Sequence, residues 1–214
     1  MENRTGKMFF ILLILAAALF PRDAFSFGFA KPSVEYSADR VMTSDSGKVA
    51  GKVYSAKDKE RMELNEGGGM VNIVRMDKKL AWTLMPSKKM YMEHKFSEQK
   101  GKRANGDYQN CDVKQTEKGK EEVNGFSARK MAVEVSCPGN EKHTGTVWLT
   151  KEDIPIRMEI SKADSKKEMF QVELKNLKIG KQDPALFEIP AGYTPMSMPS
   201  MDDIQKMMKG QRSQ

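Results

Sequence analysis

The side chains best suited to chemistry are few and widely spaced in this sequence. His94 and His143 are the only two histidines. The carboxylate nearest to His94 is Glu93, which strand alternation places on the opposite face of a sheet. Glu121 and Glu122 lie in a charged segment, where exposure to solvent explains two adjacent carboxylates without a catalytic role. Neither a nucleophile elbow, a nucleotide loop nor an H-E-x-x-H zinc motif is found. The sequence therefore predicts no catalytic residues, no cofactor and no metal centre, and hence a protein that is not an enzyme.

Two cysteines, Cys111 and Cys137, complete the inventory of reactive groups. An even number of cysteines in an exported chain favours a structural disulfide. The spacing is not C-x-x-C, and the two histidines make a poor ligand set beside them. We interpret the pair as a disulfide, with a redox-active or metal-binding pair as the alternative.

Methionine is unusually frequent, with 17 in the chain. Those in the predicted strands stand at inward positions, where methionine either fills irregular gaps in a core or forms an adaptable surface for a lipid tail. A separate group, Met196, Met198 and Met201, lies near the C-terminus. Thioethers at such spacing can bind Cu(I), so copper binding by this tail is one of the functional alternatives.

The N-terminus reads as an export signal. Arg4 and Lys7 precede an apolar run over residues 8–20, which is shorter than the roughly 20 residues of a membrane span. Small residues follow, as in a secretory signal peptide. We predict a signal peptide over residues 1–26, a periplasmic location, one domain over residues 33–193 and a Met/Pro-rich tail over residues 194–214. A retained N-terminal anchor is the alternative.

The formal net charge is +7, but the basic residues are mixed with acidic ones along the predicted strands. A nucleic-acid footprint would cluster them with aromatic residues, so we predict no nucleic-acid partner. Contact with a membrane surface, through anionic head groups or lipopolysaccharide, would suit this charge. Solubility of a β-rich protein explains it equally, and the oligomeric state is left open.

The pattern from residue 70 to residue 92 predicts the architecture. Apolar residues alternate with polar ones in three short runs separated by tight turns, which is typical of an antiparallel meander with one apolar face. The same pattern recurs along most of the chain and predicts about ten or eleven strands. The charged residues 117–122 predict a loop, and residues 184–187 predict one helical turn. The alternation of apolar and polar residues changes parity near Lys175 and Asn176, which predicts a bulge there. A mostly β fold with one curled antiparallel sheet satisfies this pattern, and so does a two-layer sandwich.

Two motifs carry a family resemblance. They are VWLTKEDIPIRM at residues 147–158 and LFEIPAGY at residues 186–193. With the meander, they make the chain similar to an exported bacterial family of unknown function, which resembles the LolA/LolB and RseB lipoprotein-handling superfamily. The resemblance implies an unclosed periplasmic β half-barrel whose concave face can receive acyl chains.

The resulting hypothesis is a non-enzymatic binding protein of the cell envelope whose partner is the acyl chain of a lipid or lipoprotein. The alternative is a structural or envelope-stress sensor-like domain without a ligand. The side chains expected to line one apolar face are Leu80, Trp82, Leu84, Met90, Met92, Met131, Val133, Ile156, Met158 and Ile160.

Overall fold

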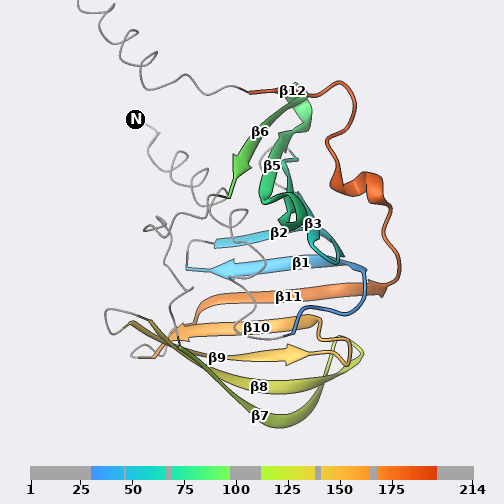
Figure 1. Cartoon of the computed structure of the whole chain (residues 1–214). Helices are drawn as coiled ribbons and strands as arrows, with labels where there is room; N and C mark the ends of the chain where they lie inside the picture. Colours follow the sequence, from blue (N-terminus) through green and yellow to red (C-terminus); the bar gives the residue numbers. More distant parts are fainter. Residues whose placement is uncertain are drawn as a thin grey trace, which may run out of the picture.

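The computed structural model describes residues 30–45, 47–65, 69–96, 112–137, 141–163 and 168–196, which form one twelve-stranded sheet (Figure 1). The predicted signal peptide, Cys111 and most of the tail lie outside these residues. The strands are β1 (Tyr36–Ser44), β2 (Gly47–Ala56), β3 (Lys59–Leu64), β4 (Val71–Arg75), β5 (Leu80–Met85), β6 (Met90–Lys95), β7 (Asp112–Val123), β8 (Phe126–Cys137), β9 (Glu141–Leu149), β10 (Pro155–Lys162), β11 (Glu168–Ile179) and β12 (Thr194–Pro195). The described residues also form the short 3₁₀ turns η1 (Met76–Lys78), η2 (Pro86–Lys88) and η4 (Pro184–Phe187).

The sheet consists of two antiparallel meanders joined edge to edge. Strands β1 to β6 form one and β7 to β11 form the other, and β1 pairs with β11 to connect them. Short loops between successive strands require antiparallel neighbours, and only the pairing of β12 with β6 is parallel among the described strands. Because β7 and β12 end the order without pairing to each other, the sheet is unclosed. The predicted mostly β, half-barrel-like fold is confirmed. In the part of the chain described, no helix is long and apolar enough to cross a membrane.

The sheet curls strongly along its length. In Figure 1, β1 and β2 lie across the view, whereas β5 and β6 lie closer to the vertical. Gly51 and Gly145 mark the direction of bending. A Cβ at Gly51 would lie 2.1 Å from the Glu63 carbonyl oxygen, and one at Gly145 would lie 2.2 Å from that of Glu159. The next strand's backbone therefore rises on this side, and glycine permits that close approach. We call this the inner face, and the opposite side the outer face.

The strand register assigns every paired side chain to one face, because directly opposed residues point the same way. Residues such as Val53, Met158 and Val172 lie on the inner face, and charged residues alternate with them on the outer face of β1, β10 and β11. Residues 183–196, which we call the strap, leave the end of β11 and pass along the sheet to β12 (Figure 1). Phe187 of the strap packs on the outer face with Ile73 and Trp82. One curled sheet thus has a second apolar cluster on its outer side.

Most predicted local features are confirmed, with two differences. The helical turn at Pro184–Phe187 is present, and a register shift opposite Ala38 places the predicted bulge at Asn176, where φ is 51°. The interpretation of residues 117–122 as a loop is wrong, because they continue β7 through a bulge at Gly119, and β8 correspondingly begins at Phe126. An edge strand tolerates polar residues on both sides because solvent reaches both.

Candidate apolar binding face

The ten side chains expected to share one apolar face are divided between two faces. Across β5 and β6, Trp82 lies opposite Glu93, and Thr83 lies opposite Met92. The expectation of one shared face is therefore wrong for the residues of β5. The residues on the outer face are Leu80, Trp82 and Leu84. The residues on the inner face are Met90, Met92, Met131, Val133, Ile156, Met158 and Ile160.

The outer-face group forms a core with the strap. Phe187 is 1% exposed and packs with Ile73, Trp82 and Leu84. Two arginines of the sheet hold the strap by its carbonyl oxygens. Arg61 Nη1 donates to Leu186 O, and Arg75 Nη1 donates to Phe187 O, each at 3.1 Å. These contacts satisfy carbonyl groups of the part of the strap that lies against the sheet before β12 pairs with β6.

Arg75 is 4% exposed and is held by two carboxylates. Its guanidinium donates to both oxygens of Asp77, at 2.8 and 2.7 Å, and to Glu188 of the strap. The hydrogen bond from Arg75 lowers the pKa of Asp77. Partial burial works to raise the pKa of Glu188, but hydrogen bonds from Arg75 and Lys78 lower it. A buried cation paired in this way ties the strap to β4.

The floor of the inner face is made by neighbouring strands of the second meander. One buried cluster on these strands consists of Met131, Val133, Val147, Leu149, Met158, Ile160 and Val172. Five of the predicted residues belong to this part of the sheet: Met131, Val133, Ile156, Met158 and Ile160. Among the described elements, the main contacts are those between adjacent strands and those of η4 with β3 and β4. The strap therefore covers the outer face near β3 and β4, and no described strand or 3₁₀ turn has a comparable contact across the inner face.

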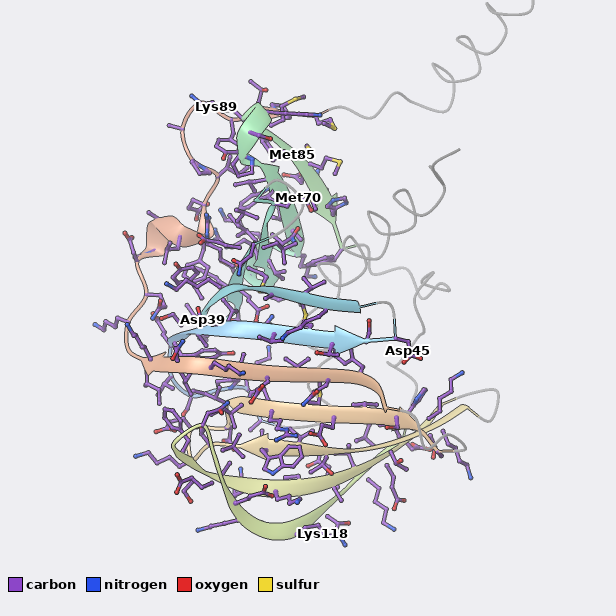
Figure 2. All side chains as sticks on the ribbon, turned by 180° about the vertical axis from the view of Figure 1, so that it is seen from behind. Asp39, Asp45, Met70, Met85, Lys89 and Lys118 are labelled. Atoms are coloured by element: carbon purple, nitrogen blue, oxygen red, sulfur yellow. The ribbon has the colours of Figure 1, made fainter. Side chains whose placement is uncertain are left out.

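A row of apolar side chains runs across the strands at one end of the inner face. We call it the rim. Its members, from β11 through β1 to β6, are Phe170, Met42, Val49, Leu64, Met70, Met85 and Met90. Leu64 is buried, and the others are half-buried. Figure 2 labels Met70 and Met85 close together in the part of the sheet formed by β4 and β5. The rim is a partly accessible row of apolar side chains in which four of the seven members are methionines, whose flexible side chains adapt to a ligand.

One ion pair interrupts the apolar inner face. Arg40 donates from Nη1 and Nη2 to the two oxygens of Glu60, at 2.8 and 2.9 Å. Burial works to lower the pKa of Arg40, but Glu60 and then Tyr36 raise it, so the guanidinium stays charged. Arg40 Nε is buried and has no hydrogen-bond partner within the described residues. The pair therefore supplies one spare donor beside the rim.

The structure shows no assembly of catalytic groups among the residues that it describes. His94 and His143 both point to the inner face but lie on β6 and β9, which are widely separated in the sheet order. No three of the described histidine, cysteine, aspartate and glutamate side chains form a group able to hold a metal ion. Glu121 instead accepts hydrogen bonds from Lys130 and from Trp148 Nε1. Both hydrogen bonds lower the pKa of Glu121, and the one from Lys130 has the larger effect.

Sequence reasoning missed most of the rim and the Arg40–Glu60 pair. The signal for the rim was present, because Met42, Val49 and Met70 each stand at the end of an alternating run. The signal for the ion pair was absent, because Arg40 and Glu60 belong to β1 and β3, which the sheet separates by β2.

Solved structures show which fold this is. A chain of the MucA/MucB complex of Pseudomonas aeruginosa is 10% identical, with a TM-score of 0.51, and the match covers 78% of this chain and 60% of that one. A structure of MucB is 9% identical, with a TM-score of 0.50, covering 77% and 60%. A LolA superfamily protein of Nitrosomonas europaea is 11% identical, with a TM-score of 0.39, covering 76% and 94%. The two MucB structures confirm the expected resemblance to the LolA/LolB and RseB superfamily as a likeness of fold, and the chain spans 60% of the length of these MucB-type chains.

The sequence also matches one family profile. The profile of a domain of unknown function, DUF4412, covers residues 39–158. These residues run from β1 into β10 and so include most strands of the sheet. No curated protein matches the chain.

Proposed function

The chain belongs to the DUF4412 family, and from this premise we propose that it is an exported, non-enzymatic protein that binds the acyl chain of a lipid or lipoprotein on its inner face. The observation that carries the proposal is the rim, a half-buried apolar row that crosses seven consecutive strands of the sheet order, from β11 to β6. A linear acyl chain matches such a row in shape and polarity. Each buried methylene contributes about 0.8 kcal/mol.

The rest of the inner face suits the same ligand. The floor cluster, against which Met42 and Phe170 pack at one end of the rim, is apolar and buried. Arg40 Nε is a buried donor beside the rim. An ester or amide carbonyl at the head of an acyl chain would accept a hydrogen bond from that nitrogen. The predicted signal peptide over residues 1–26 supports a periplasmic site of action, where lipids and lipoproteins are the available apolar ligands.

The sheet also supports a second candidate, a sensor-like domain that binds another protein. The similar fold of the MucA/MucB complex motivates it, because the name of that structure describes an assembly of two proteins. In this case the inner face is the ordinary core of the domain, and an acyl probe would not bind to it.

Two matched variants of β2 test the acyl proposal. Val49 belongs to the rim, and the neighbouring Ala50 points to the outer face. Both are half-buried and apolar, so Val49→Asp and Ala50→Asp introduce the same charge on opposite faces. Purified full-length protein is titrated with a fluorescent fatty acid, and its lipids are extracted and identified by mass spectrometry. We expect Val49→Asp to weaken probe binding at least tenfold, about 1.4 kcal/mol, and Ala50→Asp to leave it within twofold.

Failure to bind the probe, together with no extracted lipid, would refute acyl binding and favour the sensor-like domain. An equal loss in both variants would also refute it, because the effect would then come from the fold and not from the inner face. Circular dichroism of both variants shows whether each retains its sheet.

A further inference from the structure

Four side chains with nitrogen or sulfur donors gather where the strap joins β6. Met90, Met92 and His94 alternate along β6 and therefore share the inner face. Met196 follows β12 at the end of the strap. All four side chains are half-buried. In the sequence, Met196 is far from the other three, and the parallel pairing of β12 with β6 brings it beside them.

Backbone hydrogen bonds establish the position of Met196. Thr194 N donates to Lys89 O at 2.9 Å, and Met196 N donates to Tyr91 O at 2.7 Å. Thr194 pairs with Met90, so the same register places Met196 beside Met92. Neighbouring strands lie about 4.8 Å apart, and side chains two residues apart along a strand lie about 7 Å apart on one face. Two thioethers and an imidazole at these spacings can converge on one atom.

The imidazole of His94 has a buried nitrogen, Nε2, without a hydrogen-bond partner among the described residues. Buried polar side-chain atoms are nearly always paired, and an exception calls for an explanation such as an ion. The carboxylate next along the strand does not contribute, because Glu93 points to the outer face and accepts a hydrogen bond from Trp82 Nε1. Thr83, the cross-strand partner of Met92, donates its hydroxyl hydrogen to Asn72 Oδ1. The candidate ligands on β6 and at the end of the strap are therefore thioether sulfur and imidazole nitrogen.

We propose that Met92, Met196 and His94 bind Cu(I), with Met90 as a neighbouring fourth donor. Thioethers and imidazole select Cu(I) over the hard cations Mg²⁺ and Ca²⁺, which require oxygen ligands. The site differs from a copper-binding tail of Met196, Met198 and Met201, because two of its three ligands belong to the sheet. The site shares Met90 with the rim, but its three ligands Met92, His94 and Met196 are not rim members, so variants of these three residues test copper binding separately from acyl binding.

The test is an anaerobic titration of full-length protein with Cu(I) against a chromophoric chelator of known affinity. We expect one Cu(I) per chain and at least a tenfold loss of affinity in each of Met92→Leu, Met196→Leu and His94→Gln. Methionine and leucine are similar in volume, so the fold is retained. Met158→Leu is the matched control, because Met158 lies on the inner face in β10, away from β6, and its affinity should equal that of the parent protein.

X-ray absorption of the copper complex provides a second readout, and we expect both sulfur and nitrogen scatterers. Unchanged affinity in Met92→Leu and His94→Gln would overturn the proposal. So would a loss confined to Met198→Leu and Met201→Leu, which would assign the copper to the tail. Because the acyl probe is measured separately, a protein that binds Cu(I) and no lipid would refute acyl binding and leave the copper site supported.

Discussion

Trp82 donates a hydrogen bond from its indole Nε1 to Glu93 Oε2 at 3.1 Å, across the outer face of β5 and β6. The cross-strand partner of Met92 is Thr83, which points to the inner face. The sequence pattern predicts that Trp82 and Met92 share one apolar face, but the two side chains lie on opposite faces of the sheet. Trp82 belongs to the core beneath the strap, and Met92 belongs to the candidate ligand face.

Replacing Phe187 with alanine should destabilise the protein without changing the inner face. Phe187 is 1% exposed and fills the space over Ile73 and Trp82. Large-to-small replacement of a buried phenylalanine costs about 3–5 kcal/mol. The free energy of unfolding from urea denaturation checks this value. Ile179→Ala is the control, because Ile179 is 43% exposed and surface changes usually stay within about 0.5 kcal/mol. Equal stability of the two variants would show that the strap contributes no core.

Acid should weaken the attachment of the strap. The pKa values of Asp77 and Glu188 are lowered in the folded protein, from unfolded values of about 4. A carboxyl group with a lowered pKa stabilises the fold fully above its unfolded pKa, and this contribution disappears as the pH falls through the folded pKa. The urea midpoint of the parent protein should therefore exceed that of Asp77→Asn at pH 7.

The difference between the two proteins should shrink as the pH falls below about 4, because protonated Asp77 no longer differs in charge from asparagine. A difference that is constant from pH 7 to pH 2 would show that the charge of Asp77 is not what stabilises the strap.

Gly145 is required by the curl of the sheet. A Cβ at this position would lie 2.2 Å from Glu159 O and 2.5 Å from Ile160 Cδ1. Backbone cannot move away as a flexible side chain can, so Gly145→Ala should cost at least about 1–3 kcal/mol, the range for overpacking. Thermal unfolding followed by circular dichroism measures the effect. Gly180→Ala is a matched control, because nothing lies within 4 Å of a Cβ there. A Gly145→Ala variant as stable as Gly180→Ala would contradict the assigned direction of bending.

The cysteine pair remains a prediction, because Cys111 lies outside the described residues. We expect a thiol-reactive reagent to label neither cysteine in denatured, unreduced protein from the periplasm, and both after reduction. Reduction should lower the free energy of unfolding by about 3–4 kcal/mol in the chain-entropy estimate. Labelling of both cysteines without reductant would refute the disulfide.

The sequence alone determined the class of fold and most of its strands. Alternation between apolar and polar residues is a local property, and short loops leave antiparallel pairing as the only choice. The helical turn at Pro184–Phe187 and the bulge at Asn176 were likewise readable from proline and from a parity change. Residues 117–122 were misread because an edge strand needs no buried face, so alternation of hydrophobicity does not mark it.

Only the tertiary structure decided on which face of the sheet the apolar residues of each strand lie. Alternation shows that Leu80, Trp82 and Leu84 share a face, and that Met90 and Met92 share a face. It does not show that the two faces differ, because this depends on the register across a turn. The same holds for the ligands proposed for copper. Met196 and Met92 become neighbours through one pair of parallel backbone hydrogen bonds, and no periodicity in either segment contains that information.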